Sequence, residues 1–218
     1  MDVRRVDPEA PDDEALLAAA EAVLRGGVIA FPTDTLYGLG CSLFDESAVA
    51  MVARLKRRDP SLAVISLIPE PRQVYGLAQN VSDVAEQLVR KWWPGPLSLI
   101  FKAAAIVPVR VRGAGGTVAL RCPKDTLCLK LLDRIGGPVV SSSANLSGQR
   151  PAETADEVIR VFGNQIDLIL DGGPRVGGVA STLVDVSGAR PRLLRLGKAD
   201  VRPDLGDFED ARTPEGAG

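Results

Sequence analysis

The stretch at residues 138–148 constrains the fold more than any other part of this sequence, because a buried strand becomes a polar segment there. Two valines, Val139 and Val140, precede three consecutive serines, and Ala144 and Asn145 follow. Neither a period of 2 nor a period of 3.6 describes the apolar residues across this change. Short hydroxyl and amide side chains beside backbone N–H groups suit contact with phosphate or carboxylate oxygens. The alternative is a serine-rich turn that caps the next helix, since these residues readily bond to local backbone.

A second stretch, residues 26–40, repeats the change from an apolar strand to hydroxyl groups. An apolar run through Phe31 is followed by Pro, Thr, Asp and Thr, the last of which is Thr35. Gly38 and Gly40 then allow close backbone approach or a positive φ. Ligands of α/β proteins bind at the carboxyl ends of sheet strands. Two strand ends that carry hydroxyls therefore predict a site for a polar ligand.

The absence of histidine restricts the chemistry of this chain. None of the 218 residues is a histidine, which excludes Ser-His-Asp and Cys-His catalysis and histidine-ligated metals. Catalysis must then come from positioning, fixed charges, hydroxyls, carboxylates or a metal ion that the substrate brings. The formal net charge of −2 argues against a broadly basic nucleic-acid-binding surface, although it is compatible with local basic patches.

Cysteine content and hydropathy predict a protein of the reducing cytoplasm. Cys41, Cys122 and Cys128 have no CxxC spacing, which argues against a disulfide framework and against a cysteine-rich zinc site. No apolar run approaches the roughly 20 residues of a membrane span, and the acidic start is unlike a signal peptide. With 45% apolar residues, a chain of this length suits one α/β domain.

Periodicity and cap residues predict alternating helices and strands. The first helix is expected to begin at a cap formed by Asp12 or Asp13. Helices are predicted at about residues 13–25, 45–58, 82–91, 124–134 and 153–162. Strands are predicted at about residues 28–31, 63–68, 97–101, 138–140, 167–170, 181–185 and 193–196.

Two further segments predict a mixed sheet, and the chain ends predict little structure. Residues 107–111 and 117–121 are typical of a pair of strands joined by a Gly-rich turn, and such a hairpin is antiparallel. Residues 1–12 are polar, and residues 199–218 combine Pro, Gly and acidic residues with little apolar content. Flexible termini are expected at both ends.

Three other motifs accompany the two hydroxyl-bearing strand ends. They are Lys56-Arg57-Arg58, Trp93-Pro94-Gly95-Pro96-Leu97 and Ser181-Thr182-Leu183-Val184-Asp185. These motifs and the two strand ends, taken in their order along the chain, resemble those of the YrdC-like L-threonylcarbamoyladenylate synthases of the single-domain, bacterial type. The resemblance covers residues 13–198. It implies a single-domain α/β fold with a twisted mixed β-sheet, flanking helices and a concave ligand-binding face.

The resemblance also implies a reaction and partners. The chain would make L-threonylcarbamoyladenylate and pyrophosphate from L-threonine, bicarbonate and ATP. A tRNA-modifying protein complex would then transfer the threonylcarbamoyl group to a tRNA adenosine. Mg²⁺ would arrive bound to the phosphates of ATP and would need few protein ligands. Such a reaction depends on neutralising and aligning anions, which suits a chain without histidine.

Individual roles follow from the same resemblance. Lys56 and Arg58 would be the catalytic pair facing bicarbonate and the triphosphate, although the helix dipole also gives cations at a helix C-terminus a structural explanation. L-Threonine would be bound by Thr35, Ser181 and Arg121, with the guanidinium on its carboxylate. ATP would be bound by Lys56, Arg58, Thr117, Ser141, Ser143, Asn145 and Arg195.

One loop departs from the family pattern. After Lys-x-Arg the family has two or three residues, then Lys or Asn, then Pro-Leu, whereas Ser61 and Leu62 occupy this region here. Leu67 stands near the position where some members have a histidine. One ligand contact is then missing or supplied elsewhere. Two alternatives follow: a paralogue with another carbamoyl-adenylate substrate or reduced activity, and an RNA-binding YrdC-like module.

Overall fold

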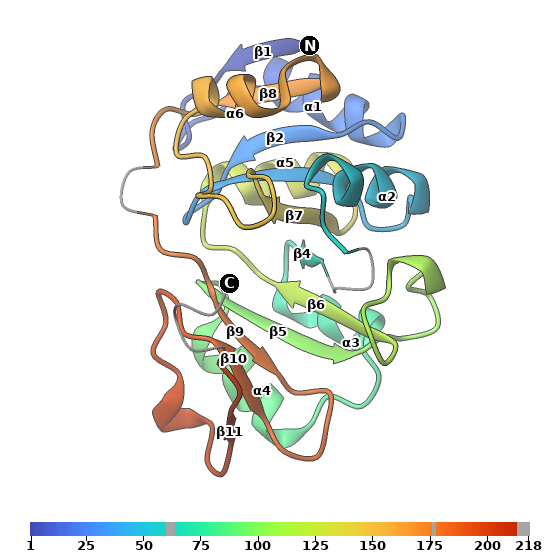
Figure 1. The fold of residues 1–218 in the computed structure, drawn as a ribbon, viewed down its shortest axis with the longest axis vertical. Coiled ribbons are helices and arrows are strands. Elements are labelled where there is room, and N and C mark those ends of the chain that lie inside the picture. The colour runs from blue at the N-terminus through green and yellow to red at the C-terminus, as the bar shows by residue number, and fades with distance from the viewer. Residues whose placement is uncertain (60–63, 176–177, 213–218) are drawn as a thin grey trace.

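One mixed β-sheet extends through the molecule and carries helices on both faces (Figure 1). The computed structural model describes residues 1–59, 64–175 and 178–212. The strands are β1 (Asp2–Arg5), β2 (Ile29–Pro32), β3 (Tyr37–Ser42), β4 (Ile65–Leu67), β5 (Leu97–Lys102), β6 (Thr117–Arg121), β7 (Val139–Ser143), β8 (Leu168–Asp171), β9 (Thr182–Asp185), β10 (Arg192–Arg195) and β11 (Glu209–Asp210). Their spatial order is β1-β8-β2-β3-β7-β4-β6-β5-β9-β10-β11. Parallel pairs such as β4 with β6 occur beside antiparallel pairs such as β5 with β6, so the predicted mixed α/β sheet is confirmed.

The helices divide between the two faces of the sheet. On one face, α1 (Asp13–Leu24) packs against α5 (Thr126–Ile135), and together they cover a core that includes Phe31 and Leu67. The second core, which includes Tyr37 and Leu99, is covered by α2 (Glu46–Leu55), α3 (Val74–Leu77), α4 (Asp83–Trp92) and α6 (Ala155–Phe162). Short 3-10 turns complete the chain: η1 (Pro71–Gln73), η2 (Val109–Val111), η3 (Gly163–Gln165) and η4 (Arg202–Asp204).

Side-chain caps fix the starts of the longer helices. Asp12, rather than Asp13, caps α1 by accepting a hydrogen bond from Ala15 N at 2.9 Å. Thr154 likewise caps α6. Such caps satisfy N–H groups that have no partner within the helix, and each typically stabilises by about 1 kcal/mol. The helices therefore begin where the cap residues predict.

Strand β3 was not expected from the sequence. It lies antiparallel between β2 and β7, and its glycines allow these strands to approach closely. A Cβ on Gly38 would lie only 2.7 Å from Ser141 Oγ, and a Cβ on Gly40 would collide with the Phe31 ring. Gly38 and Gly40 interrupt the apolar alternation from which a strand is predicted, yet the close packing of β3 requires both of them.

The hairpin predicted for residues 107–111 and 117–121 is wrong. Residues Val109–Val111 form the 3-10 turn η2, while β6 pairs antiparallel with β5. The Gly-rich segment still makes a turn, since Thr117 bridges to Gly113. Val111 is buried in the core from this turn, so its apolar character reflects packing and not a strand.

The described residues near both chain ends carry more secondary structure than expected. The expectation of a flexible segment at residues 1–12 is wrong for β1, which pairs parallel with β8 and is followed by the buried Val6. At the other end, Val201 and Leu205 are buried and β11 pairs with β10. Strands at a sheet edge can pair through backbone hydrogen bonds with few apolar residues. Composition alone therefore did not predict β1 and β11.

Candidate functional site

A cavity of about 190 Å³ lies on the sheet face that α1 and α5 partly cover. Leu67 connects the two regions, since it packs in the core beneath these helices and also lines the cavity. The rest of the floor is formed by Ile65, Ile100, Ala119 and Leu183 from β4, β5, β6 and β9. Sheet side chains therefore form the floor of this cavity, and polar groups come from its walls.

The walls combine hydroxyls and guanidinium groups from separate parts of the chain. Thr35 follows β2, Ser141 and Ser143 belong to β7, and Ser181 precedes β9. The predicted site residues that line the cavity are Thr35, Arg58, Arg121, Ser141, Ser143, Ser181 and Arg195. The structure thus gathers most of the predicted site into one place.

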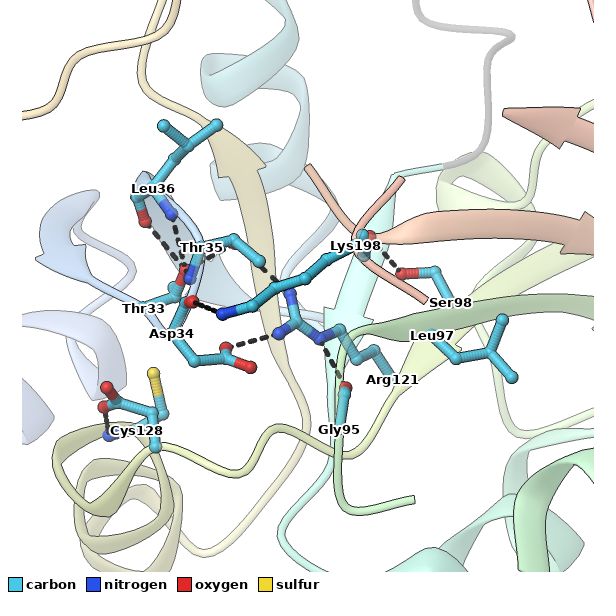
Figure 2. Close-up of polar contacts among 12 residues, drawn as sticks. Thr33, Asp34, Thr35, Leu36, Gly95, Leu97, Ser98, Arg121, Cys128 and Lys198 are labelled. Atoms are coloured by element: carbon cyan, nitrogen blue, oxygen red, sulfur yellow. Dashed lines mark hydrogen bonds and ion pairs between the residues drawn. The ribbon is translucent and has the colours of Figure 1, made fainter. Parts of the chain in front are cut away.

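A tight turn after β2 fixes the direction of the Thr35 hydroxyl (Figure 2). Thr33 Oγ1 donates to Leu36 O at 2.7 Å, because a carbonyl oxygen can only accept. Thr33 and Thr35 hydroxyls lie 2.9 Å apart, and the single Thr33 hydrogen is already used, so Thr35 donates to Thr33. Toward the cavity, Thr35 Oγ1 is therefore left as an acceptor.

Arg121 is the most enclosed of the three arginines that line the cavity, with a side chain only 5% exposed. Its Nε donates to Gly95 O at 3.0 Å, and its Nη1 donates to Thr35 Oγ1 at 3.4 Å. Its Nη2 donates to Asp34, with which it forms an ion pair (Figure 2). These contacts use three of the five guanidinium N–H groups and fix its plane. The two remaining donors suit a carboxylate.

Ser181 is held between a second buried serine and Arg195. Ser98 Oγ lies 2.8 Å from Ser181 Oγ, and Ser98 is completely buried in β5. Arg195 Nη2 donates to Ser181 Oγ at 3.3 Å, and its Nε donates to Ser181 O at 3.0 Å. One residue on β5 and one on β10 thereby set the orientation of a cavity hydroxyl that lies just before β9.

The arginines of the cavity raise its positive potential. Burial, the charge of Arg121 and the charge of Arg58, in that order, lower the pKa of Arg195. Burial also lowers the pKa of Arg58, against the opposing effect of Asp59. Both shifts mean that the cavity disfavours the charged forms of these two arginines. An anionic ligand would relieve this repulsion, so the site suits a multiply charged anion.

Lys56 does not line this cavity, although it was predicted to act with Arg58. Its ammonium group donates to the carbonyl oxygens of Ser143 and Asn145, and to Asn145 Oδ1 at 3.1 Å. Lys56 O in turn accepts from Ser147 N at 2.8 Å. Burial, followed by the charge of Arg58, lowers the pKa of Lys56 to about 8. Lys56 thus connects the end of α2 to residues 143–147, and these contacts are called the Lys56 tie below.

Two predicted ATP-binding residues also lie outside the described cavity wall. Asn145 belongs to the tie around Lys56, as its contacts show. Thr117 lies two positions before the cavity residue Ala119 on β6, and its hydroxyl donates to Ala114 O at 3.1 Å. Thr117 therefore shares the strand face of the cavity but is engaged with its own turn.

Sequence reasoning missed Asp34 and Ser98. Asp34 lies inside the quoted stretch 26–40, but its pairing with Arg121 depends on residues far apart in sequence. Ser98 follows the Pro-Gly-Pro-Leu motif and is one polar residue in an apolar strand, which was the available signal. A buried polar group in a strand requires a partner, and here the partner is a site residue.

The described residues offer no protein metal centre, because no group of three or more His, Cys, Asp or Glu side chains among them could hold a metal ion. Nor does any described helix have the length and apolar character needed to cross a membrane. The departure from the family pattern at Ser61 and Leu62 falls outside the described residues.

Comparison with known proteins gives the family of the chain. The Sua5/YciO/YrdC family model, whose description is "Telomere recombination", matches residues 21–197. The chain belongs to this family. A protein of Mycobacterium leprae, provisionally named as a threonylcarbamoyl-AMP synthase, is 39% identical over 193 residues, which cover 88% of this chain and 87% of that protein. A threonylcarbamoyl-AMP synthase of Cellvibrio japonicus is 38% identical over 154 residues, covering 71% of this chain and 82% of the relative.

A solved structure of the family matches the fold closely. The crystal structure of P. abyssi Sua5 complexed with L-threonine superimposes with a TM-score of 0.90 and 33% sequence identity. The match covers 96% of this chain and 62% of the Sua5 chain, so the present chain spans less than two thirds of that protein. The expected YrdC-like fold is confirmed.

Proposed function

We propose that this family member is an L-threonylcarbamoyladenylate synthase. It would use L-threonine, bicarbonate and ATP and would release pyrophosphate, which makes it a nucleotidyltransferase. One observation carries the proposal: hydroxyls from three strand ends meet Arg58, Arg121 and Arg195 in a single cavity. The names of its relatives agree with it, and one related structure contains L-threonine.

The polar groups of L-threonine match three parts of this cavity. The two remaining donors of Arg121 suit the carboxylate, and the acceptor of Thr35 suits the ammonium group. Ser181 then remains for the β-hydroxyl. All three residues line the same cavity, so they can bind one small amino acid together.

The reaction brings several anions together, and the arginines offset their repulsion. The threonine ammonium group first loses one proton to solvent. The amine nitrogen then forms a bond to the bicarbonate carbon and passes a second proton to the hydroxide that leaves, so that carbamate and water are formed. A carbamate oxygen then attacks the α-phosphorus of ATP, and the bond to pyrophosphate breaks. Arg58 and Arg195 would hold the phosphates beside Ser141 and Ser143. Alignment and charge neutralisation supply the catalysis, as a chain without histidine requires.

The proposal extends to the metal ion, the location and the partner. Mg²⁺ would bind the phosphate oxygens of ATP, which fits a site without a cluster of carboxylates in the described residues. We propose a cytoplasmic location, where a tRNA-modifying protein complex would receive the product. Direct RNA binding has little support, because the net charge of the chain is −2.

The decisive experiment measures pyrophosphate release from ATP with L-threonine and bicarbonate each omitted in turn. We expect release to require both. Release that continues without L-threonine would instead support a paralogue with another substrate. No ATP binding by calorimetry, together with salt-sensitive RNA binding, would support the RNA-binding module.

A further inference from the structure

Ser98 is a buried hydroxyl that touches the site without lining it. It lies in β5, is completely buried, and its Oγ is 2.8 Å from Ser181 Oγ. Among the described residues, Ser181 Oγ is the only hydrogen-bond partner of the Ser98 hydroxyl. Ser181, by contrast, lines the cavity and also accepts from Arg195 Nη2 at 3.3 Å. The direction of the bond between the two serines decides what Ser181 presents to a ligand.

The direction of this bond follows from which of the two hydroxyl hydrogens has another acceptor. If Ser181 donated to Ser98, the Ser98 hydrogen would be buried without an acceptor in the described structure, which typically costs about 1–3 kcal/mol. If Ser98 donates to Ser181, both Ser98 and Arg195 direct hydrogens at Ser181 Oγ. The Ser181 hydrogen is then directed away from both and into the cavity that this residue lines. Ser181 therefore acts as a donor toward the ligand.

This polarity is opposite to that of Thr35 on the other wall. Thr35 donates its hydroxyl hydrogen to Thr33, so its oxygen is an acceptor toward the cavity. The amino-acid site thus has one donor hydroxyl and one acceptor hydroxyl, each set by a neighbouring buried hydroxyl. With the carboxylate on Arg121 and the ammonium group on Thr35, the β-hydroxyl oxygen is the substrate acceptor left for Ser181.

We propose that Ser98 is a positioning residue that makes Ser181 a hydrogen-bond donor to the β-hydroxyl of the amino-acid substrate. Ser98 would thereby determine specificity for a hydroxylated amino acid without touching it. This inference rests on the proposed function. A site built to bond a substrate hydroxyl discriminates strongly against the analogue that lacks it.

The test compares L-threonine with L-2-aminobutyrate, which lacks only the hydroxyl group. Dissociation constants for both ligands are measured by calorimetry in the wild type, Ser98→Ala, Ser181→Ala and the double variant. We expect the preference for L-threonine to fall at least threefold in Ser98→Ala, with kcat for pyrophosphate release within twofold of wild type. In the Ser181→Ala background, Ser98→Ala should have no further effect, because Ser98 acts through Ser181.

Ser66 provides a matched control in the same sheet. It is also completely buried, but its Oγ has no partner in the described structure. Ser66→Ala should leave the preference for L-threonine unchanged. Ser98→Cys, which slightly enlarges the side chain and leaves a weaker donor, should lie between wild type and Ser98→Ala and avoids the space that the alanine variant leaves.

The outcomes separate the inference from the function on which it rests. An unchanged preference in folded Ser98→Ala, while Ser181→Ala loses it, would overturn the role of Ser98 alone. Independent effects of the two substitutions in the double variant would overturn it too. Wild-type protein that does not bind L-threonine would instead overturn the proposed function, and the inference with it.

Discussion

The cavity and the Lys56 tie use similar polar groups in opposite ways. In the cavity, Arg58, Arg121 and Arg195 line a space large enough for a ligand. In the tie, the ammonium group of Lys56 is surrounded by oxygen atoms of Ser143 and Asn145. Only one residue separates Lys56 from Arg58, yet the ammonium group bonds to protein oxygens whereas Arg58 lines the cavity described above. Both residues also line a second cavity of about 210 Å³.

The two cations of this basic motif therefore have different surroundings. A buried cation that is surrounded by protein oxygens contributes to the conformation of those oxygens. A cation beside a cavity contributes binding energy to an anion. Ser143 belongs to both regions, since its carbonyl accepts from Lys56 while the residue lines the cavity. The tie therefore supports the wall of the cavity.

Removing Arg121 should have the largest effect. Arg121→Gln is expected to lower kcat/KM for L-threonine by more than about 100-fold, because a charged hydrogen-bond partner of a carboxylate is lost. It should also lower stability, since Asp34 loses its partner. Arg134→Ala, which breaks an exposed ion pair with Asp13, is the matched control.

The Arg121 result can be separated from unfolding. The double variant Arg121→Gln/Asp34→Asn should recover much of the thermal stability, because the unpaired carboxylate is removed, but none of the L-threonine binding. Recovery of binding in the double variant would show that Arg121 has only a structural role.

Lys56→Met and Arg58→Met should differ in kind. We expect Lys56→Met to reduce the free energy of unfolding by about 2–4 kcal/mol, because at least two carbonyl oxygens lose their donor. Arg58→Met should instead cut pyrophosphate release by more than tenfold with a smaller change in Tm. Denaturant unfolding and steady-state rates for both variants measure the contrast. Equal stability losses would erase the distinction between cavity and tie.

The pH dependence of stability offers a sharper test of the tie. Burial lowers the pKa of Lys56 from its usual 10.5 to about 8 in the folded protein. Between these values the unfolded chain binds more protons than the folded one, so the contribution of Lys56 to stability rises with pH from about 8 to about 10.5. The rise should not exceed about 3 kcal/mol. Urea unfolding of wild type and Lys56→Met across this range gives the difference, and a flat difference would contradict the buried, destabilised charge.

The smallest effect is expected at Ser66. Its buried hydroxyl has no partner in the described structure, so Ser66→Ala should raise the free energy of unfolding by up to about 1 kcal/mol without changing catalysis. A clear loss of stability would reveal a partner for this hydroxyl. Ser66 thus tests the third case, a polar group that serves neither the cavity nor the tie.

Sequence patterns predicted the fold where local signals were strong. Caps such as Asp12 and apolar runs such as residues 97–101 identified most helices and strands. Strand β3 escaped because its glycines break the apolar alternation. Residues 107–111 misled because an apolar turn packed into a core has the composition of a strand. Edge pairing of β1 could not be predicted, since it depends on the exposed edge of β8.

The site was predictable in its parts but not in its pairings. Hydroxyls after β2 and in β7, together with Arg121 and Arg195, were found from motifs, and they do meet at one cavity. Motifs could not show that Lys56 is enclosed by backbone oxygens. Nor could they show the pairing of Ser98 with Ser181, because the two residues come together only when β5 and β9 pair.

The N-terminal strand has a practical consequence for protein engineering. Pairing of Asp2–Arg5 with Leu168–Asp171 covers one margin of the sheet. Trimming these residues, or fusing a bulky tag next to them, would expose unpaired backbone N–H and C=O groups of β8. Such groups can pair with a strand of another molecule. Affinity handles are therefore better placed elsewhere, and self-association after N-terminal trimming would report the loss of this strand.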